Sequence, residues 1–145
     1  MRTTEILLVD DNPADADLTS EVLARNNCPS HIHGVTNGVE AMAFLRREGE
    51  YANAILPDFV ILDLCLPKKD GRAVLAEVKA DPVLRKIPIA IFSTSKARQD
   101  IVRCYELGAN CYVSKPGNLT DFISAVTSIG DFWFGLARLP REEDQ

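Results

Sequence analysis

Three short stretches of the chain are apolar at every position, and they constrain the fold more than any other feature. These stretches are residues 6–9, 59–62 and 87–92. They lack the alternation of apolar and polar residues that a strand with one solvent-facing side shows. Strands of this composition are covered on both faces, as in a parallel sheet packed between helices. The sequence therefore predicts an α/β fold with these three strands at its centre.

Segments with helical periodicity separate the apolar runs. Val74, Leu75 and Val78, for example, fall on one face of a helix. Two more short segments are strand-like, which gives five strand–helix pairs in strict alternation. The predicted strands are Glu5–Val9, Ser30–Val35, Phe59–Leu62, Ile87–Phe92 and Asn110–Val113, and the predicted helices are Ala14–Arg25, Gly38–Arg47, Arg72–Ala80, Ala97–Leu107 and Asn118–Ile129. We expect a flavodoxin-like doubly wound (βα)5 parallel sheet with strand order 2-1-3-4-5.

Size, charge and cysteine content limit the remaining possibilities. The 145 residues fit one domain, which we expect over 1–130, with a C-terminal extension over 131–145 that frays from Pro140. The net charge of −5 argues against nucleic acid and anionic membrane surfaces as partners. The first apolar run ends at two aspartates, so we expect neither a signal peptide nor a membrane span. Cysteines at 28, 65, 104 and 111 form no C-x-x-C pair, which favours a reducing, cytoplasmic location.

Acidic residues follow two of the central strands. Asp10 and Asp11 end the first strand, and Asp63 ends the third. In the predicted sheet these two strands are neighbours, so the three carboxylates converge beyond their carboxyl ends. Like charges so close require a cation, and hard oxygen ligands suit Mg²⁺. One such acid alone would be a solvated loop residue or a cap for the helix that begins at Pro13; three at one edge favour the metal site.

A hydroxyl and an ammonium are expected at the same edge. Ser93 ends the fourth strand, and Lys115 follows the fifth. Taken singly, each has an ordinary explanation as a strand-end hydroxyl or a surface lysine. Together with Mg²⁺ they are the groups that stabilise a transferring phosphoryl group. A carboxylate among them can act as the covalent nucleophile.

These motifs identify the sequence as resembling the response-regulator receiver domain of two-component systems. The resemblance covers residues 5–129, and Ser93 and Lys115 follow Asp63 by 30 and 52 positions. It is carried by Leu8-Val9-Asp10-Asp11-Asn12, Ile61-Leu62-Asp63-Leu64-Cys65-Leu66-Pro67, Asp70-Gly71, Ile87-Pro88, Ser93-Thr94 and Lys115-Pro116.

The resemblance implies a role for each matching residue. Asp63 would be the phosphoacceptor for a histidine kinase, and the protein would catalyse only its own phosphorylation and dephosphorylation. Mg²⁺ would be held by Asp11 and Asp63 directly, by Asp10 mainly through water, and by the backbone carbonyl of Cys65.

The same resemblance supplies the switch. Ser93, Thr94 and Lys115 would bind the phosphoryl group, and Tyr112 would turn inward when Ser93 moves. The bond before Pro116 would be cis. The chain departs from the commoner family pattern at several positions: serine stands for threonine at 93, Thr94 is bulkier than usual, and Cys65 occupies a position that tunes dephosphorylation.

The C-terminal stretch suggests how the signal leaves the domain. About fifteen residues follow the last predicted helix, too few for a DNA-binding module. Phe132, Phe134 and Leu136 lie off the helical stripe that ends at Trp133, which indicates an interface, although the tail could instead fold over its own sheet edge. This ending resembles the single-domain regulators of cyanobacterial and bacterial phytochromes. By that resemblance we expect a phytochrome-type kinase partner and a symmetric homodimer through the fourth helix, the fifth strand, the fifth helix and the C-terminal extension.

Other interpretations of the sequence predict features that differ from those of a receiver. His31 and His33 share one face of the second strand, but no third ligand is near them in sequence, so we expect solvated edge-strand residues. A pseudo-receiver that is never phosphorylated would be expected to lose the acids or the lysine. An aspartyl-phosphate phosphohydrolase would show Asp-x-Asp and a cap domain. A flavodoxin-type carrier would need a phosphate-binding loop where Asp10 and Asp11 stand.

Overall fold

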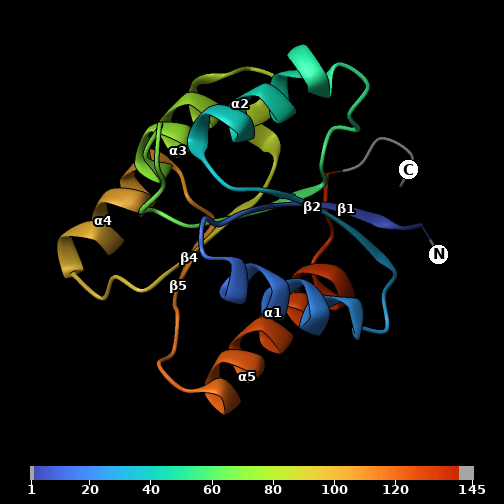
Figure 1. Ribbon diagram of the computed structural model, residues 1–145, viewed down its shortest axis with the longest axis vertical. Coiled ribbons are helices and arrows are strands. Elements are labelled where there is room, and N and C mark those ends of the chain that lie inside the picture. Colours follow the sequence, from blue (N-terminus) through green and yellow to red (C-terminus); the bar gives the residue numbers. More distant parts are fainter. Residues whose placement is uncertain (1, 141–145) are drawn as a thin grey trace.

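The computed structural model describes residues 2–140, and its ten main elements alternate between strand and helix (Figure 1). The strands are β1 (Thr4–Val9), β2 (Ser30–Val35), β3 (Phe59–Leu62), β4 (Ile89–Ser93) and β5 (Cys111–Ser114). The helices are α1 (Pro13–Ala24), α2 (Gly38–Arg46), α3 (Gly71–Ala80), α4 (Arg98–Leu107) and α5 (Leu119–Gly130). Every predicted strand and helix is therefore present, with ends that differ by at most two residues.

The five strands form one parallel sheet in the order β2-β1-β3-β4-β5. This is the predicted doubly wound order, with β1 and β3 paired at its centre. Residues 6–9 and 59–62 are 2% exposed or less, which confirms that both faces of these strands are covered. Successive side chains of β1 enter different cores: Leu7 packs beneath α2 and α3, and Ile6 beneath α1 and α5.

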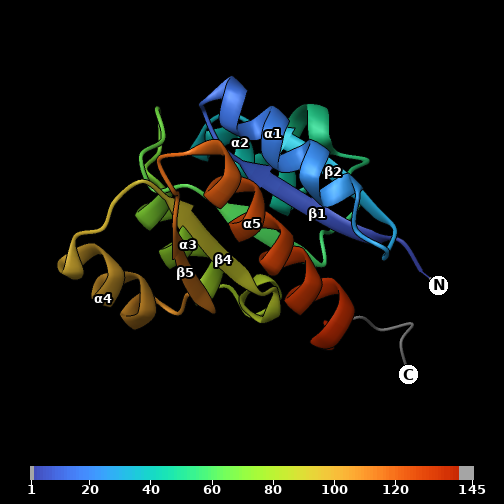
Figure 2. The same cartoon turned by 90° about the horizontal axis from the view of Figure 1, so that it is seen from below.

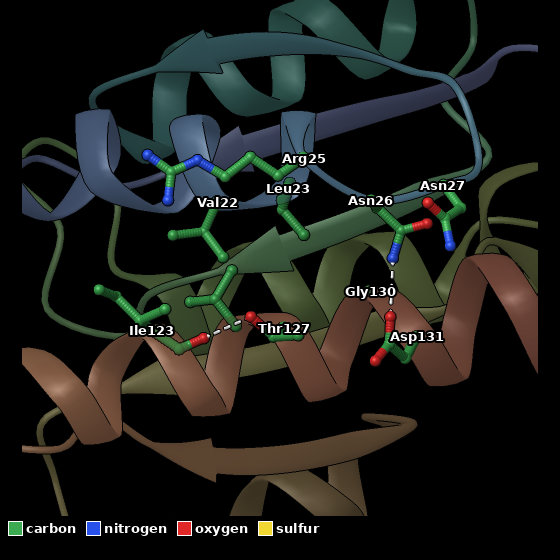
Figure 3. A pocket seen from close by; sticks show the side chains of 10 residues that line it. Val22, Leu23, Arg25, Asn26, Asn27, Ile123, Thr127, Gly130 and Asp131 are labelled. Carbon is green, nitrogen blue, oxygen red and sulfur yellow. Dashed lines mark hydrogen bonds between the residues drawn. The ribbon is translucent and has the colours of Figure 1, made fainter.

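Figures 1 and 2 show the two helical layers, with α1 and α5 side by side on one face of the sheet. Asn26 follows α1 and donates a hydrogen bond to Asp131 Oδ1 at 3.0 Å, joining the C-terminal ends of the two helices. A pocket of about 130 Å³ lies between these ends (Figure 3). Its lining includes Leu23, Val126 and Thr127, and none of the site residues predicted from the sequence. In the described part of the chain, no helix is long and apolar enough to span a membrane.

Polar side chains begin four of the five helices. Asn12, Asn37, Asp70 and Asn118 each accept a hydrogen bond from a backbone N–H in the first turn of the helix that follows. Helix α4 differs, because Ala97 precedes it and supplies no side-chain cap. The first turn of α4 is instead held through Asp100, which accepts hydrogen bonds from Ser95 and Arg72.

The C-terminal extension continues α5 as a π-helix over Asp131–Leu136, which the sequence did not predict. Trp133 packs on Phe59 with ring centroids 5.1 Å apart, and Phe134 meets the same ring edge-on at 5.6 Å. The prediction that Phe134 points away from the core is therefore wrong. The wider π turn brings this side chain back toward the sheet, and Leu139 is buried beyond it. The expected fraying beyond Pro140 lies outside the described residues.

Gly71, at the start of α3, allows a close backbone contact that positions the loop after β3. A Cβ at this position would lie 2.1 Å from the backbone oxygen of Asp63. We expect Gly71→Ala to lower the free energy of unfolding by about 3 kcal/mol, because neither backbone can move freely. Urea denaturation measures this loss. Gly34→Ala is the matched control, since a Cβ there would meet nothing within 4 Å; an equal loss in both variants would contradict the contact.

Candidate functional site

The predicted acidic cluster forms at the carboxyl edge of β1 and β3. Val9 and Leu62 are paired across these strands, so Asp10 and Asp63 follow at the same level. Carboxylate oxygens of Asp10, Asp11 and Asp63 all lie within 4.8 Å of one another. Asp10 and Asp63 are buried and Asp11 is exposed. The cluster thus combines two desolvated carboxylates with one that opens to solvent.

Local hydrogen bonds orient these carboxylates. Asp10 Oδ1 accepts from the backbone N–H of Asn12 at 3.0 Å, and Asp63 Oδ1 accepts from Leu64 at 2.7 Å. Asn12 caps α1 by accepting from the Asp15 N–H at 3.0 Å. Asn12 therefore serves as the helix cap, and Asp11 remains free for another role.

Lys115 reaches across the sheet edge from the end of β5. Its Nζ donates to Asp10 Oδ2 at 2.8 Å, to Asp63 Oδ2 at 2.9 Å and to Asp15 Oδ2 at 3.0 Å. The backbone N–H of Lys115 donates to the Ser93 carbonyl at 2.7 Å, which fixes the Lys115 backbone beside the end of β4. The prediction from the sequence missed Asp15. Its place in the first turn of α1 was the available signal, because that turn starts directly above the site.

The Lys115–Pro116 bond corrects one expectation. No peptide bond in residues 2–140 is cis, so the predicted cis bond before Pro116 is wrong. The trans form is the intrinsically favoured isomer of an X–Pro bond. With that form, Lys115 already makes its three ion pairs.

Burial and charge compete at this site. Burial raises the pKa of the Asp10 carboxyl above its ordinary value of 3.8, although hydrogen bonds from Lys115 and Asn12 act in the opposite direction. Burial alone would lower the pKa of the Lys115 ammonium. The three carboxylates outweigh it, so the pKa of Lys115 is raised above its usual range. The lysine is therefore a permanent cation here.

The donor set fits a hard divalent cation. Asp10, Asp11, Asp15 and Asp63 together outnumber the single ammonium of Lys115. Carboxylate oxygens are the ligands that Mg²⁺ or Mn²⁺ takes, and exposed Asp11 leaves one side of the cluster to solvent. Cys65 follows Asp63 by two residues and is exposed, and ligation through its carbonyl remains a prediction.

The other predicted residues lie along the neighbouring strands. Ser93 is fully buried at the end of β4, and Thr94 after it is exposed. Tyr112 on β5 is partly buried, and its hydroxyl donates to the backbone carbonyl of Ser95 at 2.8 Å. Burial raises the pKa of the Tyr112 hydroxyl, which keeps it protonated and able to donate. Tyr112 is thus bonded to the loop that follows Ser93.

A polar network that sequence reasoning missed extends from this loop. Ser95 Oγ donates to Asp100 Oδ2 at 2.6 Å, and Arg72 of α3 donates to Asp100 Oδ1 at 2.8 Å. Arg72 also binds Asp70, the cap of its own helix. No spacing in the sequence indicates these contacts, because they join α3 to the start of α4 through side-chain rotamers. The network links the β4–α4 loop to the loop that follows Asp63.

Asp10→Asn tests the cost of burying this carboxylate. Because its pKa is raised on folding, the folded state binds more protons than the unfolded state, and stability falls as the pH rises above 3.8. We expect the variant, without metal, to gain about 3 °C in Tm near neutral pH, and the gain to vanish at acidic pH. Thermal unfolding in EDTA across pH measures this. Exposed Asp11→Asn is the control, and a loss of Tm for Asp10→Asn at every pH would contradict the argument.

Comparisons with known proteins agree with this fold. The chain is 44% identical over 135 residues to the response regulator Rcp1 of Synechocystis sp., covering 93% of this chain and 92% of that protein. The Mn²⁺-bound structure of Rcp1 superposes with a TM-score of 0.93 at 43% identity, covering 95% of this chain and 99% of that one. The phosphorylated cyanobacterial phytochrome response regulator RcpA gives 0.94 at 49% identity, covering 97% and 100%.

A family-level comparison covers most of the chain. The family described as the response regulator receiver domain matches residues 6–127. This range includes both acidic strand ends, Ser93 and Lys115. The chain therefore belongs to the response regulator receiver family.

Proposed function

We propose that the protein accepts a phosphoryl group on Asp63 from a histidine kinase. The observation that carries this proposal is the environment of the Asp63 carboxylate. One oxygen is held by Lys115 at 2.9 Å and the other by the Leu64 N–H at 2.7 Å, and Asp10 and Asp11 lie within 4.8 Å. The side chain is oriented but retains a small solvent-exposed area, as an attacking nucleophile needs.

In the proposed transfer, an Asp63 oxygen attacks the phosphorus of a phosphohistidine. The new O–P bond forms as the N–P bond breaks, and the imidazole leaves. Asp10, Asp11, Asp63 and the Cys65 carbonyl would hold Mg²⁺, which neutralises charge on the phosphoryl oxygens. Lys115 moves from its aspartate partners toward the new anion, and the hydroxyls of Ser93 and Thr94 donate hydrogen bonds to it.

The switch would run through the β4–α4 loop. Binding of the phosphoryl group would shift Ser93. Ser95 lies two residues further along the same loop, and its carbonyl accepts a hydrogen bond from the Tyr112 hydroxyl. That hydrogen bond must then break or move, which frees the tyrosine to repack. Asp100 in the first turn of α4 accepts a hydrogen bond from Ser95, so a movement of the loop pulls on the start of this helix. The α4-β5-α5 surface is the expected output.

Similar proteins of known structure support a role for this protein in light sensing. One similar structure is a phytochrome response regulator, and another is the bacteriophytochrome response regulator AtBRR, 38% identical with a TM-score of 0.74. We infer that the kinase partner is of the phytochrome type and that the protein works in the cytoplasm. A receiver of this kind acts on no substrate beyond its own aspartate.

The extension and α5 would form a homodimer interface. An apolar groove of about 490 Å³ lies between β5 and α5, lined in part by Val113, Ile129 and Phe132. Phe132 is 49% exposed and Leu136 is 74% exposed beside it. An apolar surface of this kind fits a second copy placed by twofold symmetry. Phe134 is left out of this interface, because it packs on Phe59.

Phosphorylation is tested by intact mass after incubation with acetyl phosphate and Mg²⁺. We expect one added phosphoryl group on the wild type and none on Asp63→Asn, because the amide cannot act as the nucleophile. Asp17→Asn, an exposed change on α1, is the control and should be phosphorylated like the wild type. EDTA should abolish the addition. A folded wild type that stays unmodified, even with a phytochrome kinase, would favour the pseudo-receiver.

Dimerisation is tested by size-exclusion chromatography with light scattering. We expect Leu136→Glu to shift the wild-type dimer to monomer, since the interface would bury a charge without a partner. Val39→Glu places the same charge on an exposed residue of α2 and should leave the dimer intact. A monomeric wild type, before and after phosphorylation, would refute this interface.

A further inference from the structure

Two histidines and a glutamate meet on the edge of the sheet away from Lys115. His31 and His33 are alternate residues of the edge strand β2, and Glu5 lies on the neighbouring strand β1 (Figure 1). Glu5 and His31 are direct partners in the register, so all three side chains project from the same face. The sequence did not show this third group, because strand pairing supplies it.

The three side chains converge on one oxygen. His33 Nε2 lies 2.8 Å from Glu5 Oε1, and His31 Nδ1 lies 3.4 Å from the same atom. One ligand atom from each residue can be chosen so that all three lie within 4.8 Å of one another. Ligand atoms of a tetrahedral Zn²⁺ with bonds of about 2.0–2.1 Å are about 3.3 Å apart. The cluster is thus close to the spacing that such an ion imposes.

Because the Glu5 carboxylate is buried, a positive charge beside it would stabilise the cluster. Glu5 is only 8% exposed, and a buried carboxylate is retained when it is paired or bound to a metal. The nearest cationic residue in sequence, Arg2, is directed to Asp58 at 3.4 Å. The groups in contact with the carboxylate are the two imidazoles, which are neutral ligands in their unprotonated form.

The surroundings shield one side of the cluster and leave the other open. The His33 ring packs against Phe44 of α2 with centroids 5.3 Å apart, and its side chain is 24% exposed. His31 is 64% exposed on the outer side, where water can complete the coordination. His33 is therefore not the solvated edge residue that the sequence suggested. An apolar wall of this kind strengthens metal–ligand interactions.

We propose that Glu5, His31 and His33 form a Zn²⁺ site that joins β1 to β2, with water as the fourth ligand. Two imidazoles and one carboxylate are a donor set that selects zinc over magnesium. The site is separate from the acidic cluster, because Asp10 follows the end of β1 and is five residues from Glu5, about 17 Å of extended chain. The two sites can therefore hold different ions at once.

Equilibrium dialysis against Zn²⁺ in excess Mg²⁺ tests the site. We expect the wild type to bind one zinc ion, and His31→Gln to bind it at least about 100-fold more weakly through loss of a ligand. His31 is exposed, so this variant should fold normally. Zinc should also raise the Tm of the wild type and leave that of His31→Gln unchanged.

Controls separate this site from other zinc-binding groups. Asp63→Asn removes a carboxylate of the acidic cluster, and Cys65→Ser removes the exposed thiol; both should retain full zinc affinity. Nitrogen NMR of the imidazoles should show coordination at His33 Nε2 and His31 Nδ1. Equal zinc affinity in wild type and His31→Gln, or loss of binding in Cys65→Ser, would overturn the proposal and leave a His–Glu ion pair at the strand edge.

Discussion

The rest of the site depends on the ion pairs that the Lys115 ammonium makes. The Lys115 side chain is 3% exposed, and it binds the carboxylates that follow β1 and β3 and one carboxylate of α1. Removing it would leave buried like charges facing one another, which a folded protein tolerates poorly. The lysine therefore stabilises the closed edge of the sheet in the absence of metal. It also keeps Asp63 oriented, so the same ion pairs serve both folding and the proposed chemistry.

A chain of hydrogen bonds connects the loop after β4 to the neighbouring elements. Tyr112, Ser95 and Asp100 are joined by short hydrogen bonds, and Arg72 connects them to α3. Each bond crosses from one element to the next, so a displacement at the β4–α4 loop is felt on both sides. Asp100 ties the first turn of α4 into this route. A rigid sheet with one helix start bonded to the loop after β4 is a suitable arrangement for a two-state response.

The central strands and the acidic cluster could be predicted from the sequence. Covered parallel strands are apolar throughout, so β1 and β3 and the acids that follow them were visible as patterns. What escaped prediction depends on tertiary geometry. Asp15 approaches Lys115 only because α1 crosses above the site, Phe134 returns to the core only through the π turn, and Glu5 meets His33 only through strand pairing. The trans bond before Pro116 corrects an expectation that came from resemblance alone.

The π turn at the end of α5 has a consequence for how such a chain can diverge. Trp133 and Phe134 contact the core, while Phe132 and Leu136 on the same short segment face outward. Residues that hold the domain together thus alternate with residues free to meet another molecule. An insertion or deletion here would rotate one set into the place of the other. Descendants of this sequence can change their outward residues one at a time, but they cannot change the length of the segment without rebuilding the core beneath it.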